Sequence, residues 1–531
     1  MAPMQIIVVA GFVVVMALSP VPGEASPVGP GWLPPALALA YVAVAWAATR
    51  VNAGVGLRRL MRSPGAARPL GRAPLLLALA VQVYLIAALA ALMLLGWGRF
   101  VDNALGLARV PLVGRLVALA PFVAALLAHW WAIYPLEQAL RLHRHQDRAW
   151  AGEPAPRTWT RRQYVAFNVR HHLLFVAAPV SIIILIVEVL EMLSAAERIP
   201  PAAAGALALG GAAAVFVTAP GMIVRIWRTR PLPAGALRLR LEGACRRFGL
   251  NYRNILIWDT GGVVVNAGVM GVVGPMRYVL LSDALLEHLD PDAVACVFAH
   301  EAGHVVHRHI PYLVAFTAGL LLVCVAGVRV LAAALKLPAG AAELPALLVT
   351  AAVWGALFGL LSRRFERQAD VFSAWAASGA NPGQPALTPE GVHTFARALD
   401  AVARLNGIGP QKRNYRHGSI ARRVATVWAL LEAGAGPAAV DRRIGRIKLA
   451  LWGLLAIGLA VGLLWILRHG GDAQPTDRGP AAVHVVSALA DPTRAPRAPR
   501  PRASPCDSDG HSNSLTVCDH EFPPSSHAPA P

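Results

Sequence analysis

The stretch Asp290-Pro291-Asp292-Ala293-Val294-Ala295-Cys296-Val297-Phe298-Ala299-His300-Glu301-Ala302-Gly303-His304 combines a helix start, an apolar run and two histidines. Asp290 before Pro291 is typical of an N-cap and a first-turn proline, and the predicted helix continues to about residue 309. Because residues four apart share one helix face, His300 and His304 can direct both imidazoles at one cation. Ionisable groups at the end of so apolar a helix are costly to bury unless they are paired or bind a metal.

Glu301 follows the first histidine, where it is predicted to contact a water rather than the metal itself. Zinc lowers the pKa of a bound water towards neutrality, and a nearby carboxylate can then act as general base. A catalytic zinc also needs a third protein ligand, leaving one position open for water. The metzincin pattern would require glycine at 307 and histidine at 310. The sequence has His307 and Ile310, which excludes that class.

A downstream pair of acids supplies the best candidate for the third ligand. Glu366 and Asp370 are four residues apart and share a predicted helix face. Glu366 could bind zinc while Asp370 orients a ligand histidine. The alternative is a solvated helix in which the acids pair with Arg363 and Arg367. The metal site is favoured because a two-span hairpin returns the chain to the membrane face that carries His300.

The composition indicates a membrane protein. Hydrophobic residues make up 56% of the 531 residues and charged residues 15%, with a mean hydropathy of +0.51. Soluble globular chains are less apolar and more charged. The apolar stretches that are long enough, or nearly so, to span a bilayer are 4–20, 33–48, 73–97, 110–135, 173–193, 201–224, 312–335, 344–361 and 449–467.

The net charge of +20 is concentrated in arginine-rich loops after the second, fourth, sixth and eighth apolar stretches. The positive-inside rule places these loops in the cytoplasm, with nine spans, the N-terminus inside and the C-terminal tail outside. Membrane topology therefore explains the charge better than nucleic-acid binding, and no nucleic-acid partner is expected. On this topology the polar segments 225–310 and 362–445 are both cytoplasmic.

The predicted fold class is mainly α: a polytopic α-helical membrane protein with a zincin-like α+β unit. Strands are expected at 255–265 and 277–281. The tail is rich in Pro, Arg and Ser and is predicted to be disordered; its Cys506 and Cys518 could pair in an oxidising compartment. The predicted regions are transmembrane helices at 1–224, the zinc unit at 225–445 interrupted by the hairpin at 312–361, a last transmembrane helix at 446–468, and the tail at 469–531.

Several motifs together resemble those of the M48 membrane metallopeptidases, the Ste24- and HtpX-like group. The matching segments, in order, are Asn266–Gly271 (N-A-x-x-x-G), Arg277–Asp283, His300–His304 (H-E-x-G-H) and Ser362–Asp370 (S-R-x-x-E-x-x-A-D). The resemblance covers roughly residues 250–425. It implies that His300, His304 and Glu366 bind one zinc ion per chain, that Glu301 is the base and that Asp370 supports a ligand.

The same resemblance implies substrate-binding residues. The segment containing Asn266 and Ala267 resembles the edge strand along which family members align a substrate backbone. A later segment resembles the H-P-x-x-x-x-R element, in which His417 and Arg423 would stabilise the tetrahedral oxyanion. Gly418 stands where the family usually has proline. The alternative for this segment is a basic loop that contacts lipid headgroups.

These features predict a membrane-embedded, zinc-dependent endopeptidase whose partners are the lipid bilayer and membrane-associated protein or peptide substrates. The family divides between C-terminal processing of prenylated proteins and degradation of damaged membrane proteins. The Ala- and Arg-rich composition suits a bacterial cell membrane and protein quality control, with the catalytic site on the cytoplasmic side.

Two other functions remain open. A catalytically silent membrane scaffold or regulatory pseudopeptidase would keep the fold without turnover. An intramembrane protease would carry its histidine motif inside a lipid span, whereas this motif precedes the span at 312–335. Glu188 and Arg329, within or near spans, are further functional candidates. His307 and His309 are expected to be solvated or to support the site rather than to bind metal.

Overall fold

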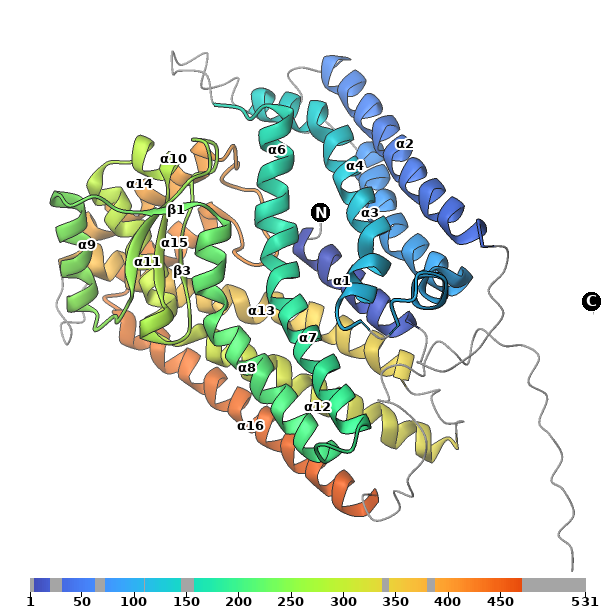
Figure 1. Ribbon diagram of the computed structural model, residues 1–531. Coiled ribbons are helices and arrows are strands. Elements are labelled where there is room, and N and C mark those ends of the chain that lie inside the picture. Colours follow the sequence, from blue (N-terminus) through green and yellow to red (C-terminus); the bar gives the residue numbers. More distant parts are fainter. Residues whose placement is uncertain are drawn as a thin grey trace, which may run out of the picture. The chain divides into compact units, whose positions relative to one another are not determined.

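The computed structural model describes residues 4–19, 31–62, 72–108, 110–144, 157–336, 343–379 and 387–469, and Figure 1 shows its mainly helical architecture. This agrees with the predicted fold class. The predicted disordered tail from residue 470 onward, with Cys506 and Cys518, lies outside the described residues.

Long helices make up the N-terminal half of the described chain. Helix α2 packs against α3 and α4, and α7 packs against α8. The tightest core of the first group is formed by Leu85, Leu89, Phe122 and Trp130. The helices are α1 (Met4–Leu18), α2 (Leu33–Arg62), α3 (Arg72–Leu92), α4 (Val113–Arg144), α6 (Arg161–Asn168), α7 (Phe175–Ala195) and α8 (Pro201–Ile226), with π-helical turns η1 (Met93–Trp97), η2 (Phe100–Ala104) and η3 (Val169–Leu174).

A four-stranded sheet follows these helices in the described residues, with strand order β1-β2-β4-β3. Strand β2 is parallel to β4, and the other two pairs are antiparallel, so β3 is an edge strand. The elements are β1 (Thr229–Pro231), α9 (Ala236–Arg247), β2 (Asn254–Trp258), β3 (Ala267–Met270), the short helix η4 (Gly274–Met276), β4 (Tyr278–Ser282) and α10 (Asp283–His288).

The prediction of one strand across 255–265 was wrong, because β2 ends at Trp258. Gly261 and Gly262 then adopt positive φ angles of 71° and 73°. The Asp283 carboxylate accepts hydrogen bonds from the backbone N–H groups of Thr260 and Gly262. These bonds to a side chain replace strand pairing and turn the chain towards β3.

The remaining helices follow the sheet in sequence. They are α11 (Pro291–Val306), α12 (His309–Ala334), α13 (Glu343–Ala377), α14 (Pro389–Leu405), α15 (Ile420–Glu432) and α16 (Pro437–His469). Asp290 caps α11 by accepting a hydrogen bond from Ala293 N at 2.8 Å, which confirms the predicted helix start. The helix ends at Val306 rather than about 309, because Arg308 adopts a positive φ of 54° that begins a turn into α12.

Two helices extend across the predicted boundaries between membrane spans and the zinc unit. Helix α13 runs without a break from the predicted span at 344–361 through the acidic pair. Helix α16 begins at Pro437, nine residues before the predicted boundary at 446. The predicted zinc unit and the long apolar helices are therefore continuous in backbone structure.

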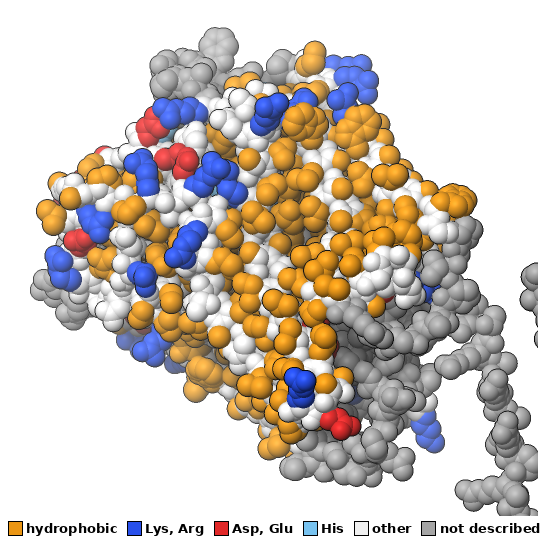
Figure 2. Space-filling model, in the orientation of Figure 1, with side chains coloured by type: hydrophobic (Ala, Val, Ile, Leu, Met, Phe, Trp, Pro, Cys, Tyr) orange, Lys and Arg blue, Asp and Glu red, His pale blue; other side chains and the backbone are white. Residues whose placement is uncertain are grey.

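In the described residues, seven helices are long and apolar enough to cross a membrane, and they coincide with seven of the predicted stretches. Figure 2 shows apolar side chains gathered over helices such as α7 and α8, whereas charged side chains cluster around α9 and β1. The apolar helix Met4–Leu18 is shorter than these spans. The seven are Leu33–Arg62, Leu76–Trp97, Val113–His143, Arg161–Ala195, Pro201–Ile226, His309–Ala332 and Pro437–Leu464.

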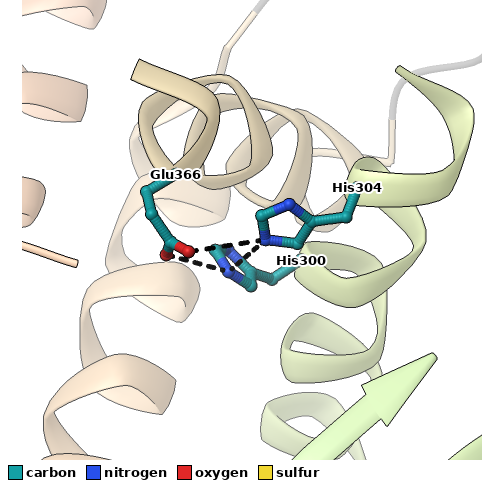
Figure 3. Close-up of side chains that lie close together, drawn as sticks. All are labelled: His300, His304 and Glu366. Atoms are coloured by element: carbon teal, nitrogen blue, oxygen red, sulfur yellow. Dashed lines mark hydrogen bonds and ion pairs between the residues drawn. The ribbon is translucent and has the colours of Figure 1, made fainter. Parts of the chain in front are cut away.

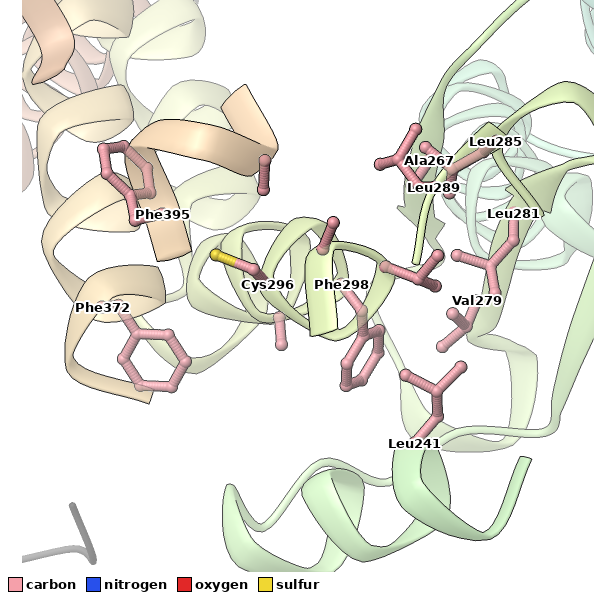
Figure 4. Close-up of a cluster of buried hydrophobic side chains, with 14 of the residues drawn as sticks. Leu241, Ala267, Val279, Leu281, Leu285, Leu289, Cys296, Phe298, Phe372 and Phe395 are labelled. Atoms are coloured by element: carbon pink, nitrogen blue, oxygen red, sulfur yellow. The ribbon is translucent and has the colours of Figure 1, made fainter. Parts of the chain in front are cut away.

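The hydrophobic core that joins the sheet to the C-terminal helices surrounds α11 (Figure 4). Phe298 is fully buried and lies on the side of the sheet residues Val279 and Leu281, while Phe372 and Phe395 lie on the other side of the helix. A fully buried Leu or Phe side chain contributes about 1.5–3 kcal/mol. Packing on both sides therefore fixes the rotation of α11 and the direction of its two histidines.

Candidate metal centre

Three side chains from two helices converge beside the core, as Figure 3 shows. His300 and His304 come from α11 and Glu366 from α13, and one ligand atom from each lies within 4.8 Å of the others. Nε2 of His300 lies 3.5 Å from Oε2 of Glu366, and Nε2 of His304 lies 3.7 Å from Oε1. The two Nε2 atoms are 3.3 Å apart. All three groups predicted as ligands are therefore brought together.

A glycine allows α11 and α13 to approach closely enough for this convergence. A Cβ atom at Gly303 would lie 3.2 Å from Cα of Ala369 and 3.2 Å from the side chain of Phe372. Few Cβ contacts in proteins are that short, and the backbone of Ala369 cannot move aside as the end of a flexible side chain can. The glycine between the two histidines thus sets the distance between the helix with the imidazoles and the helix with the carboxylate.

Asp370 joins one ligand histidine to an arginine. Its Oδ1 lies 3.1 Å from Nδ1 of His300, and it accepts hydrogen bonds from Nε and Nη2 of Arg423 at 2.9 and 2.5 Å. Burial raises the pKa of Asp370, but Arg423 and His300 lower it below its ordinary value. The alternative pairing with Arg363 is not observed, since Arg363 donates to the backbone oxygen of Tyr415.

Glu366 is almost fully buried, at 4% exposure, and is surrounded by cationic and imidazole groups. Its Oε1 lies 2.8 Å from Nδ1 of His417, and its Oε2 lies 3.6 Å from Nη2 of Arg423. Burial raises the pKa of Glu366, but the nearby imidazoles of His300 and His417 hold it well below its ordinary value. The ionised form is thus favoured, as a metal ligand requires.

The donor set fits zinc. Two imidazole nitrogens and one carboxylate oxygen are the ligands of many catalytic zinc sites. Oε2 of Glu366 is buried and has no hydrogen-bond partner among the described residues, which leaves an acceptor facing the cluster. Burial lowers the pKa of His300, but Asp370 and Glu366 raise it to about 10. A site that attracts a proton this strongly also attracts a cation.

Glu301 lines a cavity of about 400 Å³ together with His300 and Glu366. Burial raises the pKa of Glu301, and nearby His300 lowers it only in part. A carboxylate whose pKa is raised accepts a proton more readily near neutral pH. Its position and its basicity both suit the predicted role of general base.

The cavity beside His300, His304 and Glu366 has polar and apolar lining residues. Asn266, His417 and Arg423 contribute to the polar side, together with the residues of the cluster. Helix α14 contributes an apolar wall, formed by Phe395, Leu399 and Val402. The cavity can therefore accept an apolar side chain beside a polar reacting group.

The predicted substrate residues differ in their surroundings. Asn266 lines the cavity, and its backbone oxygen accepts a hydrogen bond from Ser282 N. Ala267 is buried, and it pairs in register with Leu281 at the start of β3. Bonding alternates along an antiparallel pair, so the backbone groups of Ala267 face the open edge of the sheet. Asn266 thus contributes to the lining of the cavity, whereas Ala267 presents its backbone N–H and C=O groups at the open edge of the sheet.

The other candidate residues from the sequence lie outside the cavity or contact a candidate metal ligand. Glu188 pairs with Arg115 at 2.9 Å and, like Arg329, does not line the cavity. His309 is buried, and its Nδ1 contacts Nδ1 of His304. The sequence predicts that His309 is either solvated or supports the site, and the structure shows the supporting position. The pairing of Arg423 with Asp370 was missed, because 53 residues separate them and no local spacing signals it.

The match to a protein-family model agrees with the geometry of the site. Residues 231–400 match the family model described as Peptidase family M48, which confirms the resemblance predicted from the motifs. No curated protein matches the chain. Among solved structures, the crystal structure of S. mikatae Ste24p aligns with a TM-score of 0.45 and 14% identity, covering 74% of this chain and 98% of that one. The family match supports a metallopeptidase.

Proposed function

We propose that the chain is a membrane-embedded, zinc-dependent endopeptidase that hydrolyses peptide bonds of membrane-associated proteins. The observation that carries this proposal is the convergence of His300, His304 and Glu366 within 4.8 Å, beside Glu301 and an open cavity. The match of residues 231–400 to a peptidase family supports it. Helices long enough to span a bilayer adjoin the site on either side in sequence, which favours substrates held at the membrane.

The chemistry divides between the metal and the side chains. Zinc, when held by the two histidines and Glu366, would polarise the scissile carbonyl and acidify a water. The Glu301 carboxylate takes a proton from the attacking water as the oxygen bonds to the carbonyl carbon. Glu301 then returns this proton to the amide nitrogen as the C–N bond breaks. Atoms and charge balance with no other co-reactant.

The groups around the cluster would hold the reacting parts in place. His417 approaches Glu366 from the loop before α15, where it could donate to the developing oxyanion. Arg423 directs two of its nitrogens at Asp370, which favours a role in holding Asp370 against His300. Oxyanion stabilisation by Arg423 stays a prediction.

An extended substrate segment would lie along the open edge of β3 and direct one side chain into the cavity. The apolar wall from α14 favours an apolar side chain there. The arginine-rich loops favour a cytoplasmic position for this face under the positive-inside rule. Degradation of damaged membrane proteins and processing of C-termini both fit such a site, and quality control in a bacterial cell membrane is the role we favour.

The decisive variant is Glu301→Gln in the full-length protein purified in detergent. It should retain one zinc per chain and lose cleavage of casein or of itself, because only the proton acceptor is removed. Chelation should stop the wild-type reaction, and added zinc should restore it. Normal cleavage by Glu301→Gln would show that the proposed mechanism is wrong.

A catalytically silent scaffold remains the second candidate. It predicts bound zinc without chelator-sensitive cleavage in the wild-type protein. If the chain is an active endopeptidase, proteins that co-purify with Glu301→Gln and are identified by mass spectrometry would define its substrates. The same capture from the wild-type protein supplies the matched control.

A further inference from the structure

A line of hydrogen-bonded side chains leads from His304 away from the metal cluster. Nδ1 of His304 lies 2.8 Å from Nδ1 of His309, and Nε2 of His309 lies 2.9 Å from Oε1 of Gln368. Nε2 of Gln368 donates to Oδ1 of Asp441 at 2.6 Å. The four residues come from α11, α12, α13 and α16, so the line connects one candidate ligand to three further helices.

The middle of the line is closed to solvent. His309 is 1% exposed and Gln368 is 3% exposed. The His309 ring also stacks on Phe365, with ring centroids 4.3 Å apart and an interplanar angle of 2°. These buried polar groups are hydrogen-bond partners of one another, so the donor and acceptor roles along the line are linked. The line reaches solvent at its two ends, since the side chains of His304 and Asp441 are 24% and 41% exposed.

The Asp441 carboxylate sets the direction of every donor in the line, because an ionised carboxylate only accepts. Gln368 must therefore turn its amide nitrogen to Asp441 and its oxygen to His309. That oxygen accepts, so Nε2 of His309 carries a proton and Nδ1 of His309 is an acceptor. Nδ1 of His304 must then donate. The lone pair of His304 is consequently left on Nε2, the atom that faces Glu366 and His300.

We propose that His309, Gln368 and Asp441 are positioning residues that fix the metal-binding tautomer of His304. The inference rests on the proposed function. It also accounts for a difference between the two histidines. His300 has a carboxylate directly at its Nδ1, whereas His304 has an imidazole there and reaches a carboxylate only through two intervening side chains. Partners of this kind orient ligand histidines and raise metal affinity.

A charge reversal at the far end gives the sharpest test. A lysine ammonium only donates, so Asp441→Lys should reverse each hydrogen bond and place a proton on Nε2 of His304. We expect zinc affinity, measured by competition with a chromophoric chelator, to fall about 10–100-fold. Asp441→Asn keeps a hydrogen-bond acceptor at this position and should lower zinc affinity less than Asp441→Lys does. Cobalt substitution should show altered visible absorption in Asp441→Lys and nearly wild-type absorption in Asp441→Asn.

A double-mutant cycle separates this effect from simple repulsion between the new lysine and the metal. Gln368→Met breaks the line while keeping the length of the side chain. In that background Asp441→Lys should cause no further loss of zinc affinity, because no hydrogen bonds remain to be reversed. An equal loss in both backgrounds would mean that repulsion explains the result, and the proposal would be overturned.

His307→Gln is the matched control. His307 stacks near His309, at 5.9 Å between ring centroids, and lies 3.9 Å from Asp441, but it is not a member of the line. It should keep wild-type zinc affinity. If wild-type protein binds zinc and Glu301→Gln loses cleavage while Asp441→Lys binds zinc normally, the positioning role fails and the proposed function stands. If the wild-type protein binds no zinc, both fail.

Discussion

Arg423 and Asp370 form a buried pair in which Nε and Nη2 of the arginine donate to the two carboxylate oxygens at 2.9 and 2.5 Å. The side chains are 11% and 2% exposed. Asp370 in turn contacts Nδ1 of His300 at 3.1 Å. The pair therefore joins α15 to the candidate metal centre through one carboxylate, and its loss should affect both stability and metal binding.

Replacing Arg423 with Met should leave the buried Asp370 carboxylate without its guanidinium partner. The expected loss is about 3–5 kcal/mol of unfolding free energy, with weaker zinc binding. Thermal unfolding in detergent would measure it. Because the pKa of Asp370 is lowered from 3.8, the contribution of the pair is present above about pH 4 and is lost as pH falls. The double variant Arg423→Met with Asp370→Asn should recover part of the stability. No recovery would contradict this account.

Close helix approach at Gly303 leads to a second prediction. Gly303→Ala should destabilise the protein by about 1–3 kcal/mol and lower zinc affinity, because the added methyl group meets the backbone of Ala369. Unfolding midpoints and chelator competition would measure the two effects. Gly243→Ala in α9 is the control, since its Cβ would meet only the flexible end of Arg246 at 3.9 Å. If Gly303→Ala changes neither stability nor zinc affinity, the contact at Gly303 does not set the distance between α11 and α13.

Local patterns predicted the parts of the site that lie within one helix or one hairpin. The N-cap at Asp290 and the shared face of His300 and His304 follow from helical spacing, and the return of Glu366 follows from chain topology. Contacts between distant segments could not be predicted in this way. The Arg423–Asp370 pair and the Gln368–Asp441 hydrogen bond span 53 and 73 residues, and only tertiary packing selects the partner.

The loop at 259–265 shows a different limit. Its run of valines favours a strand by composition. The structure forms a loop there, because two glycines adopt positive φ and the Asp283 side chain accepts the backbone N–H groups. A side chain from another segment thus overrides a local propensity, and the loop leads directly into the edge strand beside the cavity.

Metal binding should depend on pH through His300. Burial lowers the pKa of His300, but Asp370 and Glu366 raise it to about 10, so a proton occupies the metal-free site at neutral pH. Zinc must displace this proton. Affinity should therefore rise about tenfold for each pH unit between about pH 7 and pH 9. Chelator competition at several pH values would measure the slope. Asp370→Asn should flatten it, and an unchanged slope in that variant would contradict the assigned cause.

The apolar wall of the cavity should select among substrates. Val402 lies on α14 and lines the cavity, so Val402→Trp should fill space that a bulky apolar side chain would occupy. We expect kcat/KM to fall about tenfold or more for peptides with Phe or Leu beside the scissile bond, and little for peptides with Ala. Cleavage of a matched peptide series, followed by mass spectrometry, would test this. Arg404→Trp on the same helix is the control, because that side chain is 68% exposed. Equal losses for all peptides in Val402→Trp would show that the wall does not contact the substrate side chain, and the preference would then have to come from the edge strand.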